Sequence, residues 1–501
     1  MTIAAVYRSA AVAAALIWST STFAAPPDPD TLIVGIASDP VTLDPGLMAS
    51  YFEVAVQFNV HEALVSQRPD LSLEPGLASY ECPDPTTYDF KLRPGLTFHD
   101  GTPIDAAAAK FNLDRLLDPA TGSPRRPELE PIDSVTVTGP LTFEVKLKHP
   151  FAPLLQILAL RAGMLISPTA LKALGPDFAA HAVGAGPYKV VSWTKNSELV
   201  LERFDGYWRG PAPIKRIVFR PMPDETVRLM NLRSGALQLV DSVPAQSLSN
   251  VTGDPTLALK QTSGLGFNAF SFNTTRPPFS DRDVRRAFTL AVDRSVIQHA
   301  VYFDTATIAY GAIPPGAAWA YDPAFAPLKT DLPAARALLA KTGLALPIAV
   351  SLTVTNDLAQ VRAAEILQAQ AARAGFKVDI QRTDLTSLIT LLKRRTFDLA
   401  ISPWSGRSDP DGNLFGFFTR SGSANFSGYS SPSVDDLLQK GRTALDLTTR
   451  ARLYRQAEAE IAEDAPVLFL AFPAMLQAAD ASLDWIQYPD GALHLGFARY
   501  K

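Results

Sequence analysis

The amino-acid sequence predicts an α/β protein of more than one domain, and three observations support that prediction. The chain has 501 residues, 47% of them hydrophobic, which suffices for large buried cores and corresponds to roughly two to four domains. In the first half, residues 87–92 and 142–147 alternate apolar and polar side chains with period two, as half-buried strands do. From residue 348 onward, strand and helix patterns alternate, which predicts a parallel sheet with right-handed crossovers.

Composition and charge exclude several classes of protein. The hydrophobic fraction is too high, and the net charge of −4 too small, for an intrinsically disordered chain. Because 46 Lys and Arg residues face 50 Asp and Glu residues, we do not expect a nucleic-acid partner. Cys82 is the sole cysteine, so an intrachain disulfide framework and a four-cysteine zinc site are excluded.

Residues 1–24 are typical of a secretory signal peptide. Arg8 provides a short positive region, residues 10–18 are apolar, and the small residues Thr22, Ala24 and Ala25 form a cleavage site. The apolar run is shorter than the ~20 residues of a membrane span. No cysteine lies near the cleavage site. We therefore expect an exported, soluble, periplasmic protein that is not a lipoprotein.

The first half is expected to be rich in strands. Residues 104–117 are predicted to form a helix with Asp105 as its N-cap, and residues 188–193 and 199–204 a hairpin. Further strands are expected at residues 32–36, 87–92, 142–147 and 215–220.

In the second half, Asp283 is expected to cap a helix with an apolar stripe that belongs to the core. The stripe consists of Val284, Ala287, Phe288, Ala291 and Val292. The alternating region that follows predicts strands at residues 348–354, 376–380, 397–401 and 467–470, and helices at 359–374, 385–394 and 447–463.

The carboxyl ends of two predicted strands are candidates for a binding site, because ligands of open parallel sheets bind there. Asn356 follows the strand at 348–354, and residues 403–411 follow the strand at 397–401. The second segment combines an indole, a guanidinium, two carboxylates and a flexible glycine. The sequence therefore predicts a ligand-binding loop over residues 403–411.

Motifs of catalysis are absent or poorly placed. No Walker motif, G-x-S-x-G elbow or H-E-x-x-H helix occurs. Ser192 with Lys195, Ser271 with Asn273, and residues 341–343 match the three short motifs of penicillin-recognising serine enzymes. However, Ser192 lies in a strand pattern, where it and Lys195 point apart. We expect no enzyme and keep a secreted serine acylase as a remote alternative.

Five segments carry a resemblance to a known family. They are residues 87–103, 184–188, 204–208, 278–288 and 425–432. Together they are highly specific, and the match covers nearly all of the mature chain. The sequence resembles the extracytoplasmic solute-binding proteins, family 5, which serve ABC importers for dipeptides, oligopeptides and nickel.

The resemblance implies the type II periplasmic binding protein fold, with two α/β lobes and an extra subdomain in lobe I. The expected domains are a signal peptide at 1–24, lobe I at 25–267 with a subdomain at about 76–185, lobe II at 268–476 and a return to lobe I at 477–501. Two hinge strands, near residues 267–273 and 472–479, would let the lobes close around a ligand. The closed form would dock on an ABC permease, and a partner ATPase would power uptake.

One departure from the family bears on the ligand. Peptide-binding members place an aspartate three residues after the tryptophan that matches Trp404, and this chain has Arg407 there. Arg407 cannot bind an ammonium group but could clamp a carboxylate or phosphate, with Asp409 or Asp411 as a replacement anionic partner. Arg161 would add a second cation to the cleft, or else form a structural ion pair. Trp404 would stack on the ligand or pack between the lobes.

The expected function is the periplasmic substrate-binding component of an ABC importer for a small peptide-like or carboxylated solute, without cofactor and as a monomer. The alternative on the same fold is a nickel-type metal or metallophore binding protein. The residues expected to contact the ligand are Ser50, Tyr51, Arg161, Asn268, Asn356, Trp404, Ser405, Gly406, Arg407, Asp409, Asp411 and Asn425.

Overall fold

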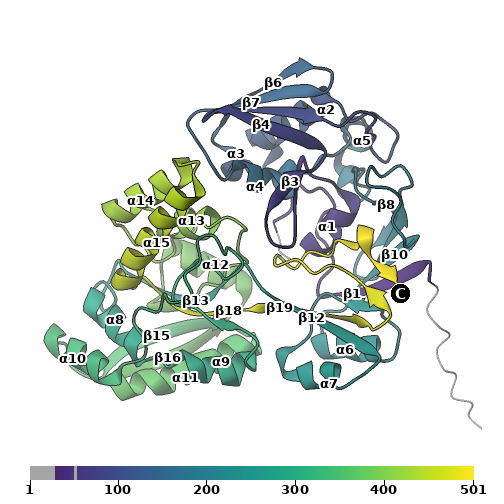
Figure 1. Ribbon diagram of the computed structural model, residues 1–501. Helices are drawn as coiled ribbons and strands as arrows, with labels where there is room; N and C mark the ends of the chain where they lie inside the picture. The colour runs from purple at the N-terminus through teal and green to yellow at the C-terminus, as the bar shows by residue number, and fades with distance from the viewer. Residues whose placement is uncertain (1–28, 50–52) are drawn as a thin grey trace, which may run out of the picture.

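The computed structural model describes residues 29–49 and 53–501, which form two α/β lobes (Figure 1). The signal peptide expected at residues 1–24 lies outside the described residues, as do Ser50 and Tyr51. Lobe I contains a seven-stranded and a four-stranded sheet, and lobe II contains a six-stranded sheet. Within the described ranges, no helix combines the length and the apolar character that crossing a membrane requires.

The main sheet of lobe I has the strand order β12-β19-β11-β1-β10-β9-β8. Its strands are β1 (Thr31–Ile36), β8 (Tyr188–Thr194), β9 (Glu198–Arg203), β10 (Arg216–Pro221), β11 (Leu239–Val240), β12 (Leu257–Ser263) and β19 (Ala474–Asp480). Strand β1 runs parallel to β10 and β11, and the remaining pairs are antiparallel. The predicted hairpin is confirmed as β8 and β9.

Shorter elements surround this sheet. They are α1 (Val54–Val60), α6 (Glu225–Arg233), α7 (Leu248–Thr252) and the paired strands β2 (Val65–Gln67) with β3 (Leu73–Pro75) and β20 (Leu483–Asp484) with β21 (Arg499–Tyr500).

The four-stranded sheet is antiparallel, in the order β4-β5-β7-β6. Its elements are β4 (Ala78–Asp84), β5 (Thr87–Leu92), β6 (Ile132–Gly139), β7 (Thr142–Leu147), α2 (Ala106–Leu117), α3 (Arg126–Leu129), α4 (Leu154–Leu158) and α5 (Pro168–Leu174). The predicted cap of α2 is confirmed, because Asp105 Oδ1 accepts a hydrogen bond from the Ala108 N–H at 2.8 Å.

The sheet of lobe II has the order β14-β18-β13-β17-β15-β16, with β15 parallel to both β16 and β17. Its strands are β13 (Asn268–Phe272), β14 (Thr307–Ile308), β15 (Ile348–Thr355), β16 (Phe376–Thr383), β17 (Leu399–Ile401) and β18 (Val467–Phe472). Its helices are α8 (Arg282–Ala291), α9 (Arg294–Tyr302), α10 (Leu332–Thr342), α11 (Leu358–Ala374), α12 (Leu385–Arg394), α13 (Asp411–Phe418), α14 (Pro432–Thr443) and α15 (Leu447–Asp464). The predicted parallel arrangement is confirmed for β15, β16 and β17, whereas β13 pairs antiparallel with β17 and β18, and β14 pairs antiparallel with β18.

Lobe II has a separate core on each face of its sheet. Along β18, Leu468 and Leu470 pack with α8 and α11, whereas Val467 and Phe469 pack with the side of the sheet that carries α13 to α15. This alternation follows from the period of two along a strand. The apolar stripe of α8 is buried as predicted. Its predicted cap is wrong, because Asp281 rather than Asp283 precedes the helix and accepts from the Asp283 N–H at 2.8 Å.

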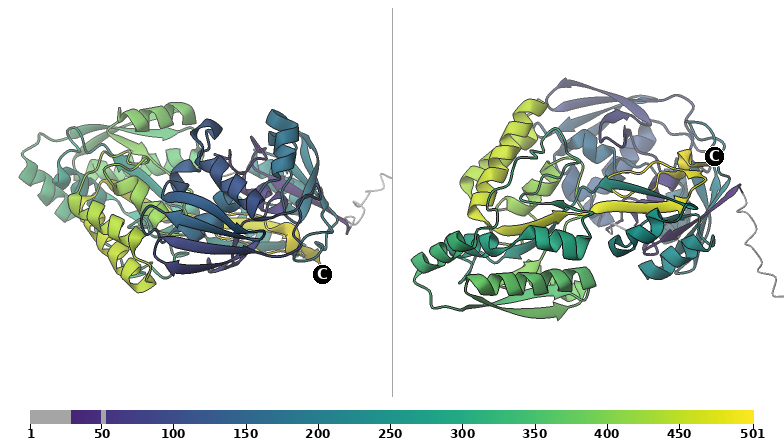
Figure 2. Two further views of the ribbon diagram at one scale, coloured as in Figure 1. Left: turned by 90° about the horizontal axis from the view of Figure 1, so that it is seen from above. Right: turned by 60° about the horizontal axis from the view of Figure 1, so that its bottom comes forward.

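The chain passes twice between the lobes, from β12 to β13 and from β18 to β19. The two connections lie side by side, since the Gly264 N–H donates to the Pro473 carbonyl at 3.0 Å. The right-hand view of Figure 2 shows the yellow strands β18 and β19 running in succession from lobe II into lobe I. The exact domain boundaries and the hinge motion remain predictions.

Candidate ligand-binding site

The loop that follows β17 is attached to the connection between β12 and β13. The Phe267 N–H donates to the Trp404 carbonyl at 3.0 Å, and the Trp404 N–H donates to the Phe267 carbonyl at 2.9 Å. Gly406 has a φ of +84°, and a Cβ atom there would lie 2.1 Å from the Leu265 carbonyl carbon. Glycine alone fits this approach. Ser405 and Gly406 therefore line a small cavity at the point where the chain changes lobes.

The Trp404 indole is held in place by lobe II. Its Nε1–H donates to Asn413 Oδ1 at 2.9 Å, and its ring meets the Phe417 ring edge-on, with centroids 4.9 Å apart. The Arg407 guanidinium lies 4.6 Å from the centroid of the indole, in cation–π geometry. Trp404 thus presents a fixed ring to an interlobe cavity of about 340 Å³.

Arg407 extends from lobe II toward the subdomain of lobe I. Its Nη2 lies 3.6 Å from Glu128 Oε1, and its Nη1 donates to the Gly406 carbonyl at 2.7 Å. Burial lowers the pKa of Arg407, the Glu128 charge acts in the opposite direction, and the Arg125 charge lowers it again. Its positive charge is therefore only partly balanced by the protein.

Two arginines contact Glu128 at this point, and a third lies near them. Arg125 is buried and donates from Nη1 to Glu128 Oε1 at 2.7 Å. Arg161, in a 3₁₀ turn of lobe I (Arg161–Gly163), lines the same small cavity as Arg407. Burial, together with the charges of Arg125 and Arg407, lowers the pKa of Arg161 to about 10. An anion bound among these guanidinium groups would relieve their repulsion.

Neutral side chains and backbone groups also join the lobes. Ser408 Oγ and Gln67 Nε2 both donate to Gln156 Oε1, at 3.3 and 2.6 Å, and the Ala152 N–H donates to the Arg442 carbonyl at 2.8 Å. Gln156 and Ser408 line both the cavity of about 340 Å³ and a second one of about 640 Å³. The cavities thus follow the boundary between the lobes.

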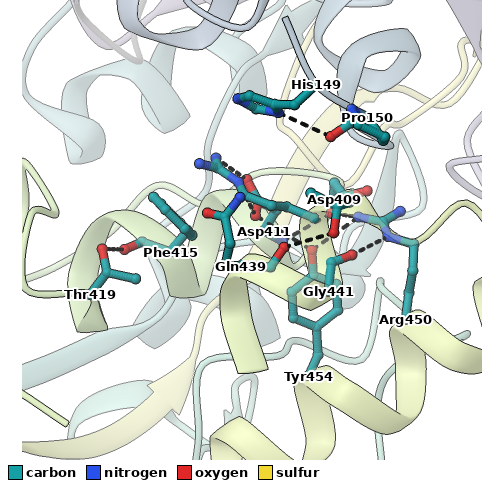
Figure 3. Close-up of polar contacts among 12 residues, drawn as sticks. His149, Pro150, Asp409, Asp411, Phe415, Thr419, Gln439, Gly441, Arg450 and Tyr454 are labelled. Carbon is teal, nitrogen blue, oxygen red and sulfur yellow. Dashed lines mark hydrogen bonds and ion pairs between the residues drawn. The ribbon is translucent and has the colours of Figure 1, made fainter. Parts of the chain in front are cut away.

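Asp409 and Asp411 border these cavities but are paired inside lobe II (Figure 3). Asp409 Oδ1 accepts from Arg450 Nη2 at 2.8 Å, and both side chains are buried. Asp411 accepts two hydrogen bonds from Arg442, at 2.9 and 3.2 Å, and one from the Tyr454 hydroxyl at 3.4 Å. Burial raises the pKa of Asp411, and Arg442 acts in the opposite direction. Because each carboxylate already has a cation, neither is available here as the replacement partner for an ammonium group.

The three predicted asparagines lie away from these cavities. Asn425 is buried, and its Nδ2 donates to the Tyr429 carbonyl at 2.7 Å within its own loop. Asn268 Nδ2 donates to the Tyr302 hydroxyl at 2.9 Å. Asn356 is exposed beyond the end of β15. The structure thus gathers Arg161, Trp404, Ser405, Gly406 and Arg407 at the lobe boundary and leaves the asparagines outside it.

Four residues of this boundary were not predicted from the sequence. Glu128, Gln156 and Asp490 line the cavities, and Arg125 is hydrogen-bonded to Glu128. Arg125 to Glu128 and Gln156 come from short helices without a sequence motif, and Asp490 comes from a Pro-Asp-Gly turn near the C-terminus. A turn was the only signal that the sequence offered for Asp490.

The serine-enzyme motifs are not assembled into a site. Ser192 is exposed on β8 of lobe I, and Lys195 Nζ lies over the Trp193 ring, 5.0 Å from its centroid. Ser271 is buried in the sheet of lobe II, hydrogen-bonded to Ser402 Oγ at 2.8 Å. In the part of the chain that the structure describes, no group of three or more His, Cys, Asp or Glu residues is arranged to hold a metal ion.

Two α/β lobes joined by two connections, with cavities along their boundary, define a type II binding protein of the periplasmic class. The chain belongs to the bacterial extracellular solute-binding proteins, family 5, whose middle-region model matches residues 72–426. The predicted family and fold class are thereby confirmed.

Relatives and solved structures agree with this assignment. The glutathione-binding protein GsiB is 29% identical in Shigella flexneri serotype 5b and 30% identical in Escherichia coli, over 507 residues that cover 97% of each chain. The structure of DppA from Helicobacter pylori in complex with peptide STSA has a TM-score of 0.83 at 24% identity, covering 94% of this chain and 98% of that one. NikA from Staphylococcus aureus in complex with Ni(L-His)2 has a TM-score of 0.80 at 22% identity, covering 94% of this chain and 100% of that one. At these identities the two structures establish the fold.

The protein is therefore a bacterial extracellular solute-binding protein. Members of this class are periplasmic, and the family and its relatives are binding proteins rather than enzymes.

Proposed function

We propose that this protein captures a small peptide-like or otherwise carboxylated solute between its lobes and delivers it to an ABC permease. The observation that carries the proposal is a group of three arginines: Arg125 and Arg407 both contact Glu128, and the charges of both lower the pKa of the nearby Arg161. A guanidinium group binds a carboxylate through two parallel hydrogen bonds, and the bond is stronger when one or both partners are charged. An excess of guanidinium groups at the lobe boundary thus favours a ligand with more negative than positive charge.

The relatives narrow the chemistry of the ligand. Glutathione, the ligand in the name of the GsiB relatives, carries two carboxylates and one ammonium group at neutral pH. Cavities of about 340 and 640 Å³ are within the range of small-molecule sites. These features support glutathione or another short acidic peptide as the solute.

The remaining parts of the proposal concern export and partners. Residues 1–24 act as a signal peptide, so the mature protein is soluble in the periplasm and carries no lipid anchor. It works as a monomer with one permease, and the ATPase of that importer powers uptake. Mass spectrometry of the mature N-terminus tests the cleavage, and sedimentation of the purified protein tests the monomer.

The ligand is tested first without assuming its identity. Native mass spectrometry of the purified protein should detect a co-purifying acidic peptide, and calorimetry should then measure its affinity. A bound nickel complex would instead support the metal-binding alternative.

The anion site is tested with Arg407→Ala. We expect it to weaken binding of glutathione by about 1–3 kcal/mol, the scale of a hydrogen bond between charged groups. Arg452→Ala, which removes an exposed arginine of α15, is the matched control and should bind with wild-type affinity. Equal affinity of Arg407→Ala and wild-type protein would contradict the anion site.

A further inference from the structure

The small cavity lined by Arg161 and Arg407 also contains a carboxylate from the C-terminal segment of lobe I. Asp490 lies in a tight turn in which the Gly491 N–H donates to the Tyr488 carbonyl at 3.0 Å. The turn is closed by a backbone bridge between Gln487 and Leu493. In Figure 1 this yellow segment loops toward the space between the lobes. Asp490 is thereby fixed at the lobe boundary, although it is distant in sequence from the rest of the site.

Asp490 faces the same small cavity as the ligand-binding loop of lobe II. That cavity is lined by Arg161 and Asp490 on one side and by Ser405 and Arg407 on the other. Asp490 also lines a neighbouring cavity of lobe I, with Phe58 shared between the two. The carboxylate therefore stands where the two cavities meet.

The charge of Asp490 has no cation bound to it within the described residues. Its Oδ1 accepts one hydrogen bond, from the Ala492 N–H at 3.0 Å, and no ion pair joins it to a neighbour in that part of the chain. Burial raises the pKa of Asp490, while the Ala492 N–H and the more distant Arg161 act in the opposite direction. Asp490 is partly exposed at this cavity, so a cation that enters the cavity could reach its carboxylate and would favour the ionised form.

The other charged side chains that line the neighbouring cavity already have partners within the protein. Arg68 and Arg209 both bind Glu74, at 2.8 and 3.0 Å. Glu62 accepts a hydrogen bond from the Tyr207 hydroxyl. Asp490 thus differs from these groups because, among the described residues, it has no oppositely charged partner and it lines the small cavity between the lobes.

We propose that Asp490 binds the ammonium group of the solute whose carboxylates lie beside Arg161 and Arg407, which line the same cavity as Asp490. This inference rests on the proposed function and adds the cationic half of the ligand to it. The solute is then a zwitterion with an excess of carboxylates. Its ammonium group is anchored to lobe I, and its carboxylates contact both lobes.

The test is a thermodynamic cycle between a side chain and a ligand group. Calorimetry compares glutathione with N-acetyl-glutathione, which lacks the ammonium charge, on wild-type protein and on Asp490→Asn. We expect Asp490→Asn to weaken glutathione binding about tenfold to hundredfold, as loss of a charged hydrogen bond does. N-acetylation should weaken binding to wild-type protein by a similar factor but have little further effect on Asp490→Asn.

Two further variants serve as controls for this experiment. Asp484→Asn, which changes an exposed aspartate of the same C-terminal segment, should bind both peptides as wild-type protein does. Asp490→Glu keeps the charge, so it should retain a preference for glutathione over the N-acetylated peptide even if Asp490→Asn does not fold.

The outcomes separate the two proposals. If wild-type protein binds both peptides equally well, the acidic-peptide assignment stands and the role of Asp490 is overturned. The role of Asp490 is also overturned, and the acidic-peptide assignment again stands, if N-acetylation lowers the binding affinity by the same factor in Asp490→Asn as in wild-type protein. If wild-type protein binds neither peptide and no acidic peptide co-purifies with it, the proposed function fails and the role of Asp490 falls with it.

Discussion

Two sets of aspartates border adjoining cavities of this protein and differ in what surrounds their charge. On lobe II, Asp409 and Asp411 are paired with Arg450 and Arg442, at 2.8 and 2.9 Å. On lobe I, Asp490 accepts one backbone hydrogen bond, and over residues 29–49 and 53–501 it takes part in no ion pair.

The difference separates carboxylates of the cavity wall that are paired within the protein from one that takes part in no ion pair among the described residues. A buried ion pair is costly to break from one side, because the remaining partner keeps an uncompensated charge. Asp490 is partly exposed and carries no such pair in the part of the chain that the structure describes, so a cation bound beside it would favour its ionised form without breaking an existing contact. Position beside a cavity is therefore a weaker guide to ligand contact than the balance of charge around the group.

The largest expected effect concerns the paired set. Asp409→Asn removes the charge opposite Arg450 but keeps the size of the side chain, so the Arg450 guanidinium stays buried without a counter-charge. At present burial lowers the pKa of Arg450, but Asp409 and, to a smaller extent, Tyr454 together more than offset that, so that the pKa lies above its ordinary value. We expect the free energy of unfolding to fall by about 3–5 kcal/mol.

Urea unfolding at neutral pH measures this change. Asp484→Asn is the control, because its contacts with Lys260 and Arg499 lie at the surface, where such a pair contributes at most about 1 kcal/mol. A loss for Asp409→Asn no larger than that of the control would mean that the Asp409–Arg450 pair is not structural.

The next effect is the dependence of stability on pH. His494, a second titratable group of the C-terminal segment, contributes to it. His494 stacks between Phe58 and Tyr488, with ring centroids 4.2 and 3.8 Å away. Burial, and then the charge of Arg209, lowers its pKa to about 3. Between pH 6.5 and 3, the unfolded chain therefore binds a proton at His494 that the folded protein does not, and stability is lost as the pH falls.

His494→Phe removes this titration and retains an aromatic ring in the stack. The loss of unfolding free energy between pH 7 and pH 5 should then be smaller by about 2 kcal/mol than in wild-type protein, from the ordinary pKa of about 6.5. Urea unfolding at the two pH values checks it. An equal loss in both proteins would show that His494 titrates normally in the folded state.

A smaller effect, of the opposite sign to that of Asp409→Asn, is expected for Asp490→Asn without ligand. Burial raises the pKa of Asp490, so its ionised form is unfavourable in the folded protein. Removing that charge should leave the free energy of unfolding unchanged or raise it by about 1 kcal/mol. Urea unfolding at pH 7 of ligand-free protein tests this directly. Destabilisation as large as that of Asp409→Asn would erase the distinction between the two sets of aspartates.

The smallest effect is expected for Asn356→Ala. Asn356 is exposed beyond β15, outside the cavities at the lobe boundary, so its replacement should change stability by less than about 0.5 kcal/mol and leave affinity unaltered. Calorimetry with the solute identified by mass spectrometry measures the affinity. A clear loss of affinity would mean that Asn356 reaches the ligand when the lobes close.

Much of the fold could be predicted because its signals are local. The period of two over β5 and β7, the alternation of β15 to β17 with α11 and α12, and the Asp105 cap each depend on residues near one another in the chain. The cap of α8 was misplaced by two residues, because Asp281 and Asp283 both suit the position and the surrounding packing decides between them.

The candidate site was predicted in part, for the same reason. The loop after β17 follows from strand order, and Trp404 and Arg407 do line the cavities. Their neighbours Glu128 and Gln156 lie far away in the chain and reach the loop only because the subdomain packs against lobe II. No local pattern marks such residues.

The sequence by itself therefore determined the family, the α/β character, the parallel order of β15, β16 and β17, and the loop that carries Trp404 and Arg407. The tertiary structure decided how the charges of that loop are balanced. The sequence does not distinguish Asp409 and Asp411 from Asp490, and all three line cavities. Asp409 and Asp411 have arginine partners, whereas Asp490 takes part in no ion pair among the described residues. The physical reason is that the energy of a buried charge depends on the groups within a few ångströms of it, and folding brings those groups together from distant parts of the chain.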